Sequence, residues 1–408
     1  MSLSTFRPFG AILFVSAALL GCSGDSPEKL LASARQYLAQ NDPKAAVVQL
    51  KNVLQRDPNS GEARFLLGKA LLEAEDPVSA AVELGKASDL KYPQDEVVPL
   101  MAKALLMQGQ VQRVTDQYAG TVLSAPTATA ALKTSVAGAY MARRDRPQAE
   151  ASLQAAFQAV PDYAPALLMN ARFLANEGDT AAARTTLDKV LGKSPGDADA
   201  WLLKGDLLLR EGDWAKALDA YREALVVRKD SLPAHAAIVS IFLSRNDLKA
   251  AKEQLDVLKK LRPNHPQTKY LEAQWAFQSG DFKTANDITQ QLLKYGDNPQ
   301  VLQLAGAVAF QNGSLIEAEQ FLDKALKTAP GLPLARRLLA QTYARSGKPA
   351  QALKTLEPLL AASEPDAGTL SLAAATYLQS GDATKGKNSS NAWSNSSPKT
   401  PAAARRWL

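Results

Sequence analysis

A motif that returns at a fixed interval constrains this chain more than any other feature. A Gly-Asp pair is followed by an alanine at the same distance in three places: Gly178-Asp179 with Ala183, Gly212-Asp213 with Ala217, and Gly280-Asp281 with Ala285. The first two pairs are one period of about 34 residues apart, and the last two are two periods apart. A fixed period of this length is typical of a repeat architecture, in which each unit buries its apolar face against its neighbours.

The residues between the motifs predict two amphipathic helices per unit, joined by a tight turn. In the unit that begins near residue 198, Trp201 and Gly205 lie on the first helix, and Tyr221 lies on the second. Small residues such as Gly205 allow two helices to approach closely, and glycine at the turn supplies the left-handed conformation that ends a helix. The pattern resembles the tetratricopeptide repeat (TPR). This resemblance implies an all-α, right-handed superhelical solenoid of helix-turn-helix units.

We expect about eleven units, the last of them incomplete. Their predicted first residues are 27, 61, 95, 130, 164, 198, 232, 266, 299, 333 and 367. A proline cannot continue a helix, so we expect it to mark the end of a unit. Prolines at that place are Pro58, Pro126, Pro161, Pro195, Pro263 and Pro330. Departures are scattered and leave the period intact; in the third unit, for example, Val114 replaces the alanine of the second helix.

Composition excludes several classes of protein. The 408 residues include one cysteine and two histidines, which excludes a disulfide framework and a cysteine-based zinc site. The net charge is +6, and six of the 47 lysines and arginines lie in residues 1–22 and 385–408, where no acidic residue occurs. The body of the chain is therefore neutral. Because nucleic-acid-binding proteins normally present a basic body or face, we expect no nucleic-acid partner.

Residues 1–21 have the organisation of a lipoprotein signal peptide. The apolar run at 11–20 is too short to cross a bilayer as a helix, but it suits a signal peptide. It ends in Leu19-Leu20-Gly21-Cys22, which resembles the bacterial lipobox, although Leu20 is a less usual residue at its place. The resemblance implies cleavage after Gly21, a lipid on Cys22 and a short linker over 22–26. More than one acyl chain would give stable anchoring.

The residue after the cysteine bears on location. Ser23 stands where an aspartate would favour retention in the inner membrane. The resemblance therefore implies a lipid-anchored protein of the bacterial envelope that faces the periplasm, at the outer rather than the inner membrane.

The end of the chain breaks the pattern. We expect the repeats to cover residues 27–385 and an irregular tail to cover 386–408. The tail is rich in serine and asparagine, which are poor helix formers, and it has no apolar stripe. A disordered tail is one interpretation. The other is a shifted reading frame, because a shift of one base from Gly386 on can read EELFERLVKLAPKDP, a helical stripe that ends in proline.

No catalytic constellation is recognisable, and we expect no enzyme activity, no cofactor and no metal. The glycines stand singly at turns and not in phosphate-binding loops, and the acidic residues are spread over helix faces. His235 falls at a packing position of a first helix, and His265 falls in a loop. Neither has an evident third ligand beside it.

A solenoid binds its partners on its concave face, which the first helix of each unit lines in TPR proteins. The candidate groove residues are Lys69, Arg172, Tyr270, Gln274, Phe277, Gln278, Gln303, Phe310, Gln311, Arg337, Gln341 and Arg345. Glutamines, arginines and aromatic rings suit an extended peptide or a polysaccharide. Packing between helices is the alternative role for Tyr270 and Phe277.

The combination of a lipoprotein signal with a long TPR array resembles the TPR lipoproteins of exopolysaccharide export and the PEP-CTERM/exosortase sorting system. The opening SPEKLLASARQYLAQNDPKAAVVQLKNVLQRDP shares this resemblance. It implies a membrane-anchored scaffold whose partners are proteins of an envelope export or polysaccharide assembly machine. One alternative is a lipoprotein of pilus or outer-membrane assembly, a class that carries fewer repeats. Another is an enzyme with a TPR accessory region.

Overall fold

The computed structural model describes residues 25–396, and all regular structure in that range is α-helical. The chain divides into two compact units between Val190 and Leu191. The helices of the first unit are α1 (Pro27–Ala39), α2 (Pro43–Arg56), α3 (Gly61–Glu73), α4 (Pro77–Asp89), α5 (Gln94–Met107), α6 (Val111–Tyr118), α7 (Pro126–Ala142), α8 (Arg146–Ala159) and α9 (Ala164–Asn176). Helix α10 (Thr180–Lys193) spans the division.

The second unit continues the same alternation. Its helices are α11 (Ala198–Arg210), α12 (Trp214–Val227), α13 (Leu232–Ser244), α14 (Leu248–Leu261), α15 (Pro266–Gln278), α16 (Phe282–Leu293), α17 (Pro299–Gln311), α18 (Leu315–Thr328), α19 (Pro333–Arg345), α20 (Pro349–Leu360), α21 (Ala367–Gln379) and α22 (Ala383–Ser396).

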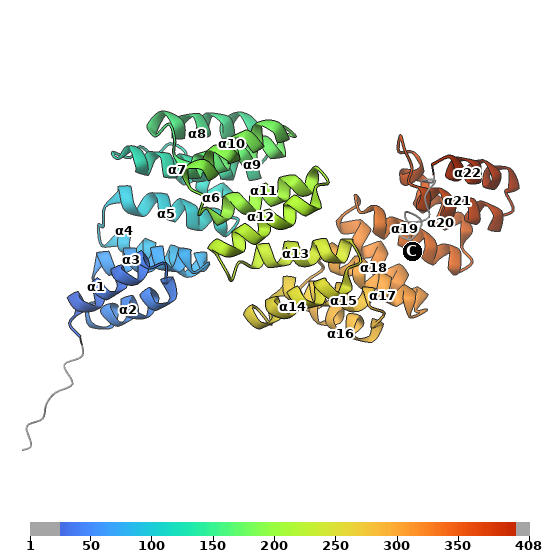
Figure 1. Cartoon of the computed structure of the whole chain (residues 1–408), viewed down its shortest axis with the longest axis horizontal. Helices are drawn as coiled ribbons and strands as arrows, with labels where there is room; N and C mark the ends of the chain where they lie inside the picture. The colour runs from blue at the N-terminus through green and yellow to red at the C-terminus, as the bar shows by residue number, and fades with distance from the viewer. Residues whose placement is uncertain (1–24, 397–408) are drawn as a thin grey trace, which may run out of the picture. The chain divides into compact units, whose positions relative to one another are not determined.

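Within each unit consecutive odd- and even-numbered helices pack as hairpins, and these pack on their neighbours along the chain. Figure 1 shows the alternation, with an odd-numbered helix followed by an even-numbered one. Within the first unit α1 contacts α2 and α3, and α3 contacts α5. Within the second unit α13 contacts α15, which contacts α17. The odd-numbered helices therefore form a layer of their own in each unit. The predicted all-α fold of stacked helix-turn-helix units is confirmed.

The predicted unit starts coincide with the observed helix starts except in the middle of the first unit. There α5 begins at Gln94, and α7 begins at Pro126 instead of residue 130. The expectation that Pro126 closes the third unit is wrong. This proline is the first residue of α7, where its missing N–H costs nothing because that group would have no helical partner. Helix α6 ends early, at Tyr118, and a longer connection precedes α7.

The turn between the two helices of a repeat has one conformation throughout. A residue in the left-handed region follows every odd-numbered helix, with φ between 57° at Asn246 and 87° at Gly178 and Gly381. Glycine occupies this place in most repeats, and Asn41, Glu75, Arg144 and Asn246 occupy it in the others. The residue after this left-handed one precedes the even-numbered helix, and in several repeats it is an aspartate whose side chain caps that helix. Asp213, for example, accepts a hydrogen bond from the backbone N–H of Lys216 at 3.1 Å.

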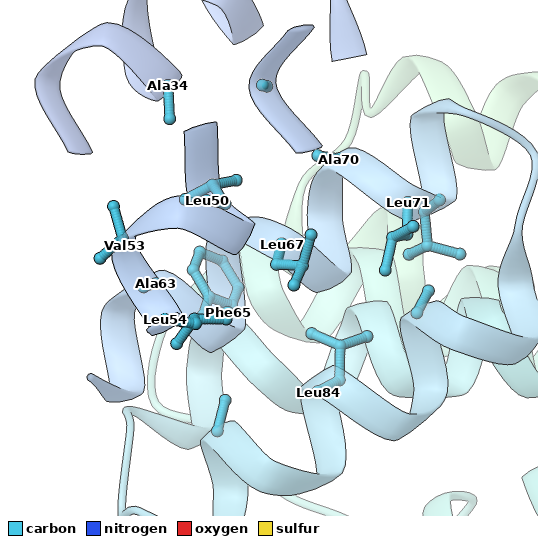
Figure 2. Packing of buried hydrophobic residues seen from close by; sticks show 14 of the residues in the cluster. Ala34, Leu50, Val53, Leu54, Ala63, Phe65, Leu67, Ala70, Leu71 and Leu84 are labelled. Atoms are coloured by element: carbon cyan, nitrogen blue, oxygen red, sulfur yellow. The ribbon is translucent and has the colours of Figure 1, made fainter. Parts of the chain in front are cut away.

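The core of each unit is a series of apolar clusters between successive hairpins. Figure 2 shows the first of these, in which Leu50 of α2, Leu67 of α3 and Leu84 of α4 are directed into the space between the helices. Leu50 and Leu84 are fully buried. Each hairpin is amphipathic and buries its apolar side only against its neighbours, so the stacking of repeats forms the core.

The eleventh repeat has a second helix, contrary to the expected irregular tail from residue 386. Helix α22 packs on α21. Asp382 caps it by accepting a hydrogen bond from the backbone N–H of Lys385 at 3.0 Å. Gly386 is buried and occupies the position that Ala352 has in the preceding repeat. A Cβ on Gly386 would lie 2.9 Å from the Leu378 side chain. A small residue at this contact and a capping aspartate thus support a helix of otherwise polar composition.

The predicted signal peptide, Gly21 and Cys22 lie outside the described residues. Within residues 25–396 no helix has both the length and the apolar character needed to span a membrane.

Candidate functional site

Four odd-numbered helices of the second unit form the layer that carries most of the predicted groove residues. Helices α15, α17, α19 and α21 each have 13 residues, and each contacts the next. Because their lengths agree, equivalent side chains recur along the layer. Their last residues form what we call the terminal row: Gln278, Gln311, Arg345 and Gln379. All four are exposed.

Two members of the terminal row connect neighbouring helices. The Arg345 guanidinium lies 5.2 Å from the centre of the Phe310 ring, within the range of a cation–π interaction between α19 and α17. The Gln379 amide donates a hydrogen bond to the backbone carbonyl of Ala344 at 3.0 Å. Sequence reasoning missed Gln379, although it lies one repeat period after Arg345 and the register alone could have found it.

The layer presents several amide side chains without a partner. Among residues 25–396, the side chains of Gln278, Gln303, Gln311 and Gln341 form no hydrogen bond. An amide offers both donors and an acceptor, which are the groups that an extended polypeptide backbone needs. The four glutamines therefore each offer donors and an acceptor that no described residue uses.

The aromatic residues of α15 belong partly to the core. Tyr270 and Phe277 pack against the apolar cluster between α15, α16 and α17. The Phe277 ring also lies 5.6 Å from the Phe282 ring, measured between centres. Burial raises the pKa of Tyr270, and the Gln274 amide donates to its hydroxyl at 3.3 Å. Packing thus accounts for both rings, and Gln274 is engaged within its own helix.

Arg337 forms an ion pair with Asp366, the residue that caps α21. Burial opposes ionisation of this carboxyl most strongly, but hydrogen bonds from Thr369 and the Arg337 charge outweigh it and lower the pKa of Asp366. Arg337 therefore has a structural partner between two repeats. The pair therefore joins α19, which carries Arg337, to the start of α21 (Figure 1).

The two early candidates lie in the first unit, apart from this layer of α15 to α21. Lys69 on α3 and Arg172 on α9 are both exposed. Burial raises the pKa of Glu73, and the charges of Lys69 and Lys103 act in the opposite direction.

The first unit contains an open pocket that the sequence did not indicate. It has a volume of about 400 Å³ and lies between α8 and α9. Leu153, Phe157 and Phe173 line it together with polar groups that include Asn170. Asn170 lies where several other repeats bury an aliphatic side chain, such as Leu67, Ile238 and Leu339.

The titratable residues of the described range form no catalytic or metal-binding cluster. No group of three histidine, cysteine or acidic side chains in residues 25–396 is placed to hold a metal ion. His235 is 5% exposed, and its Nε2 lies 3.0 Å from the Lys229 carbonyl. His265 caps α15 by accepting from the backbone N–H of Gln267 at 3.2 Å. Packing and capping account for the two histidines.

Two family models match the chain, and both describe a tetratricopeptide repeat. One matches residues 137–198, 168–236 and 270–333, and the other matches 37–104, 208–275 and 309–368. The matches fall on the hairpins described above. The chain is a tetratricopeptide-repeat protein. TPR domains bind protein partners in general, and the layer of α15 to α21 carries four of this TPR protein's partnerless amides.

Similar proteins share the repeat. A TPR protein from Parabacteroides merdae is 16% identical and covers 60% of this chain and 97% of its own, with a TM-score of 0.47. The Cut9–Hcn1 hetero-tetramer of APC/C is 15% identical over 93% of this chain and 96% of that chain, with a TM-score of 0.47. The human protein O-mannosyl-transferase TMTC3 is 28% identical over 193 residues. The match spans 46% of this chain and only 21% of that relative.

Proposed function

We propose that this TPR protein is a non-catalytic scaffold that binds extended segments of partner proteins on the layer formed by α15, α17, α19 and α21. The observation that carries the proposal is the set of four partnerless glutamine side chains on that layer, beside Arg345. Gln278, Gln311 and Arg345 end their helices and so recur at equivalent places along the layer, and Gln303 and Gln341 lie earlier in α17 and α19. A main chain laid across them would satisfy its own donors and acceptors there.

The proposal extends to place and process. The Leu19–Cys22 motif supports a lipid anchor at Cys22 in the bacterial envelope, with the repeats facing the periplasm. The resemblance to TPR lipoproteins of the PEP-CTERM/exosortase type supports a role in the production or export of exopolysaccharide. The scaffold would hold proteins of that machine together near the membrane.

A photo-crosslinking experiment tests the binding surface. A photoreactive amino acid replaces Gln311 on α17 or, as the control, Gln320 on α18 of the same repeat, and both residues are exposed. In cells that produce the full chain, we expect adducts with envelope proteins from position 311 and none from 320. Gln303→Ala with Gln341→Ala should lower the affinity, and with it the yield, by up to about thirtyfold, since each lost hydrogen bond costs roughly 1 kcal/mol. Equal yields at the two positions would contradict the proposal.

The anchor and the process need separate measurements. Cys22→Ser should abolish incorporation of labelled palmitate and release the protein from the membrane fraction. A strain that lacks the gene should lose exopolysaccharide secretion and regain it with the unaltered chain or Gln320→Ala. The Gln303→Ala, Gln341→Ala variant should restore much less. Full secretion in the deletion strain would contradict the proposed role in exopolysaccharide export. It would not bear on the proposed binding surface, which the crosslinking experiment tests.

A further inference from the structure

Three consecutive repeats of the second unit expose an apolar side chain at the same place. The turn that follows each even-numbered helix lies on one edge of a stack of antiparallel hairpins. At this edge Val227, Leu261 and Tyr295 are 41%, 40% and 87% exposed, and each is separated from the next by one repeat period. Val226, beside the first, is 69% exposed. We call these four residues the apolar edge.

Within the second unit the row is limited to these three repeats, while in the first unit Leu90 occupies the same place singly. The equivalent residues on either side are polar, Lys193 before Val227 and Thr328 after Tyr295. Exposure of apolar groups in a row has no benefit for the isolated fold, because burial of the same groups would be favourable. Single exposed apolar residues are ordinary, but a row in register over three turns indicates a contact surface.

Positive charge accompanies the apolar edge. The segments 226–230, 257–262 and 294–297 contain six lysines and arginines against two aspartates. Three of the cations are held in ion pairs, in which Arg228 contacts Asp199, Lys259 contacts Glu272 and Arg262 contacts Asp230. The side chains of Lys229, Lys260 and Lys294 have no partner within residues 25–396, and all three are exposed.

We propose that the apolar edge, together with Lys229, Lys260 and Lys294, rests on an anionic lipid surface. Lysines attract acidic headgroups and extend their stems along an apolar layer, while tyrosine suits the boundary between headgroups and acyl chains. The apolar groups stand singly on successive turns with lysines between them. This arrangement fits a deformable layer of headgroups better than the fixed surface of a protein. The proposal goes beyond the scaffold function and does not depend on a lipid at Cys22.

A single fluorescent label reports contact at this edge. The chain has one cysteine, so Cys22→Ser with Tyr295→Cys gives one site for an environment-sensitive dye. Cys22→Ser with Ile316→Cys is the control, because Ile316 is 76% exposed at the start of α18, on the opposite edge of the stack. With vesicles of equal parts phosphatidylglycerol and phosphatidylcholine, we expect the emission of the label at 295 to shift to shorter wavelengths. The label at 316 should not respond.

Charge reversal distinguishes vesicle binding through this surface from binding through another part of the chain. Lys229→Glu, Lys260→Glu and Lys294→Glu together should lower the affinity of the 295 edge for the anionic vesicles at least about a hundredfold, since each lysine contributes roughly fivefold. Lys216→Glu, Lys249→Glu and Lys283→Glu make the same change at the opposite edge of the same repeats and should have little effect. An equal response to pure phosphatidylcholine, an equal loss with the control triple, or no shift at 295 would overturn the proposal.

Discussion

The closest helix contacts in this protein depend on single glycines. A Cβ on Gly205 would lie 2.6 Å from the Tyr221 ring, and one on Gly306 would lie 2.5 Å from Leu322. Both pairs have the same separation along the chain, so they occupy the same place in their repeats. The sequence predicted close approach at Gly205, and the structure supplies the partner. Tyr221 is fully buried and donates a hydrogen bond to Asp206 at 2.6 Å, which fixes the ring that blocks a larger residue.

We therefore predict that Gly205→Ala destabilises the second unit by about 1–3 kcal/mol, the usual cost of an overpacked contact. The higher helix propensity of alanine would favour the variant by only about 1 kcal/mol. Equilibrium unfolding in urea measures the difference. Gly85→Ala is the matched control, since its Cβ would meet only Met101 at 3.9 Å, and it should be neutral or stabilising. A stabilised Gly205→Ala would show that the helices can separate at no cost.

At the scale of the element, the start of α21 depends on one aspartate. Asp366 accepts hydrogen bonds from the backbone N–H of Thr369 at 3.1 Å and from its hydroxyl at 2.6 Å, and it pairs with Arg337 of α19. The cap fixes the helix end, and the ion pair joins two neighbouring repeats. Arg337 was predicted as a groove residue, and this pair gives it a second role that the sequence did not indicate.

We predict that Asp366→Ala costs about 1–2 kcal/mol by removal of the cap. Asp366→Asn keeps one capping oxygen for the Thr369 N–H but loses the charge and the acceptor of the Thr369 hydroxyl, so it should cost about 0.5–1 kcal/mol, less than the alanine. The measurement is amide hydrogen exchange in α21 and α22.

The effect of charge at Asp366 has a defined pH dependence. The pKa of Asp366 is lowered in the folded state, so its contribution is complete above the unfolded value of about 4 and is lost as the pH falls through the folded pKa. The difference between the unaltered chain and Asp366→Asn should therefore shrink below about pH 4. A constant difference from neutral to acid pH would show that the charge on Asp366 does not stabilise this junction.

The sequence predicted most helix starts because the repeat imposes its own register. Turn glycine, capping aspartate and small contact residues recur at fixed places, and each has a local physical reason. The errors fall where a local signal has two meanings. Pro126 can end one helix or begin the next, and the composition after Lys385 indicates no helix unless α21 offers a surface to pack on. The ion-pair partner of Arg337 is Asp366, which caps the first helix of the next repeat, and helical periodicity does not specify such a contact.

At the scale of the whole molecule, the fold consists of local contacts. Within each unit the hairpins pack on their neighbours, and the apolar clusters follow one another along the chain. In such an array the stability is close to a sum of repeat and interface contributions, so a change in one repeat affects its neighbours first. The partnerless glutamines of α15 to α21 can therefore vary without effect on the hairpins of the first unit.

This locality gives a reciprocal prediction. Leu50→Ala on α2 and Leu322→Ala on α18 each remove a fully buried side chain and should cost about 2–5 kcal/mol. Hydrogen exchange should quicken in α1 to α4 for the first variant and in α17 to α20 for the second, with the other unit unchanged in each case. If either substitution quickened exchange equally along the whole chain, the protein would unfold as one cooperative body, and the addition of repeat contributions would not describe it.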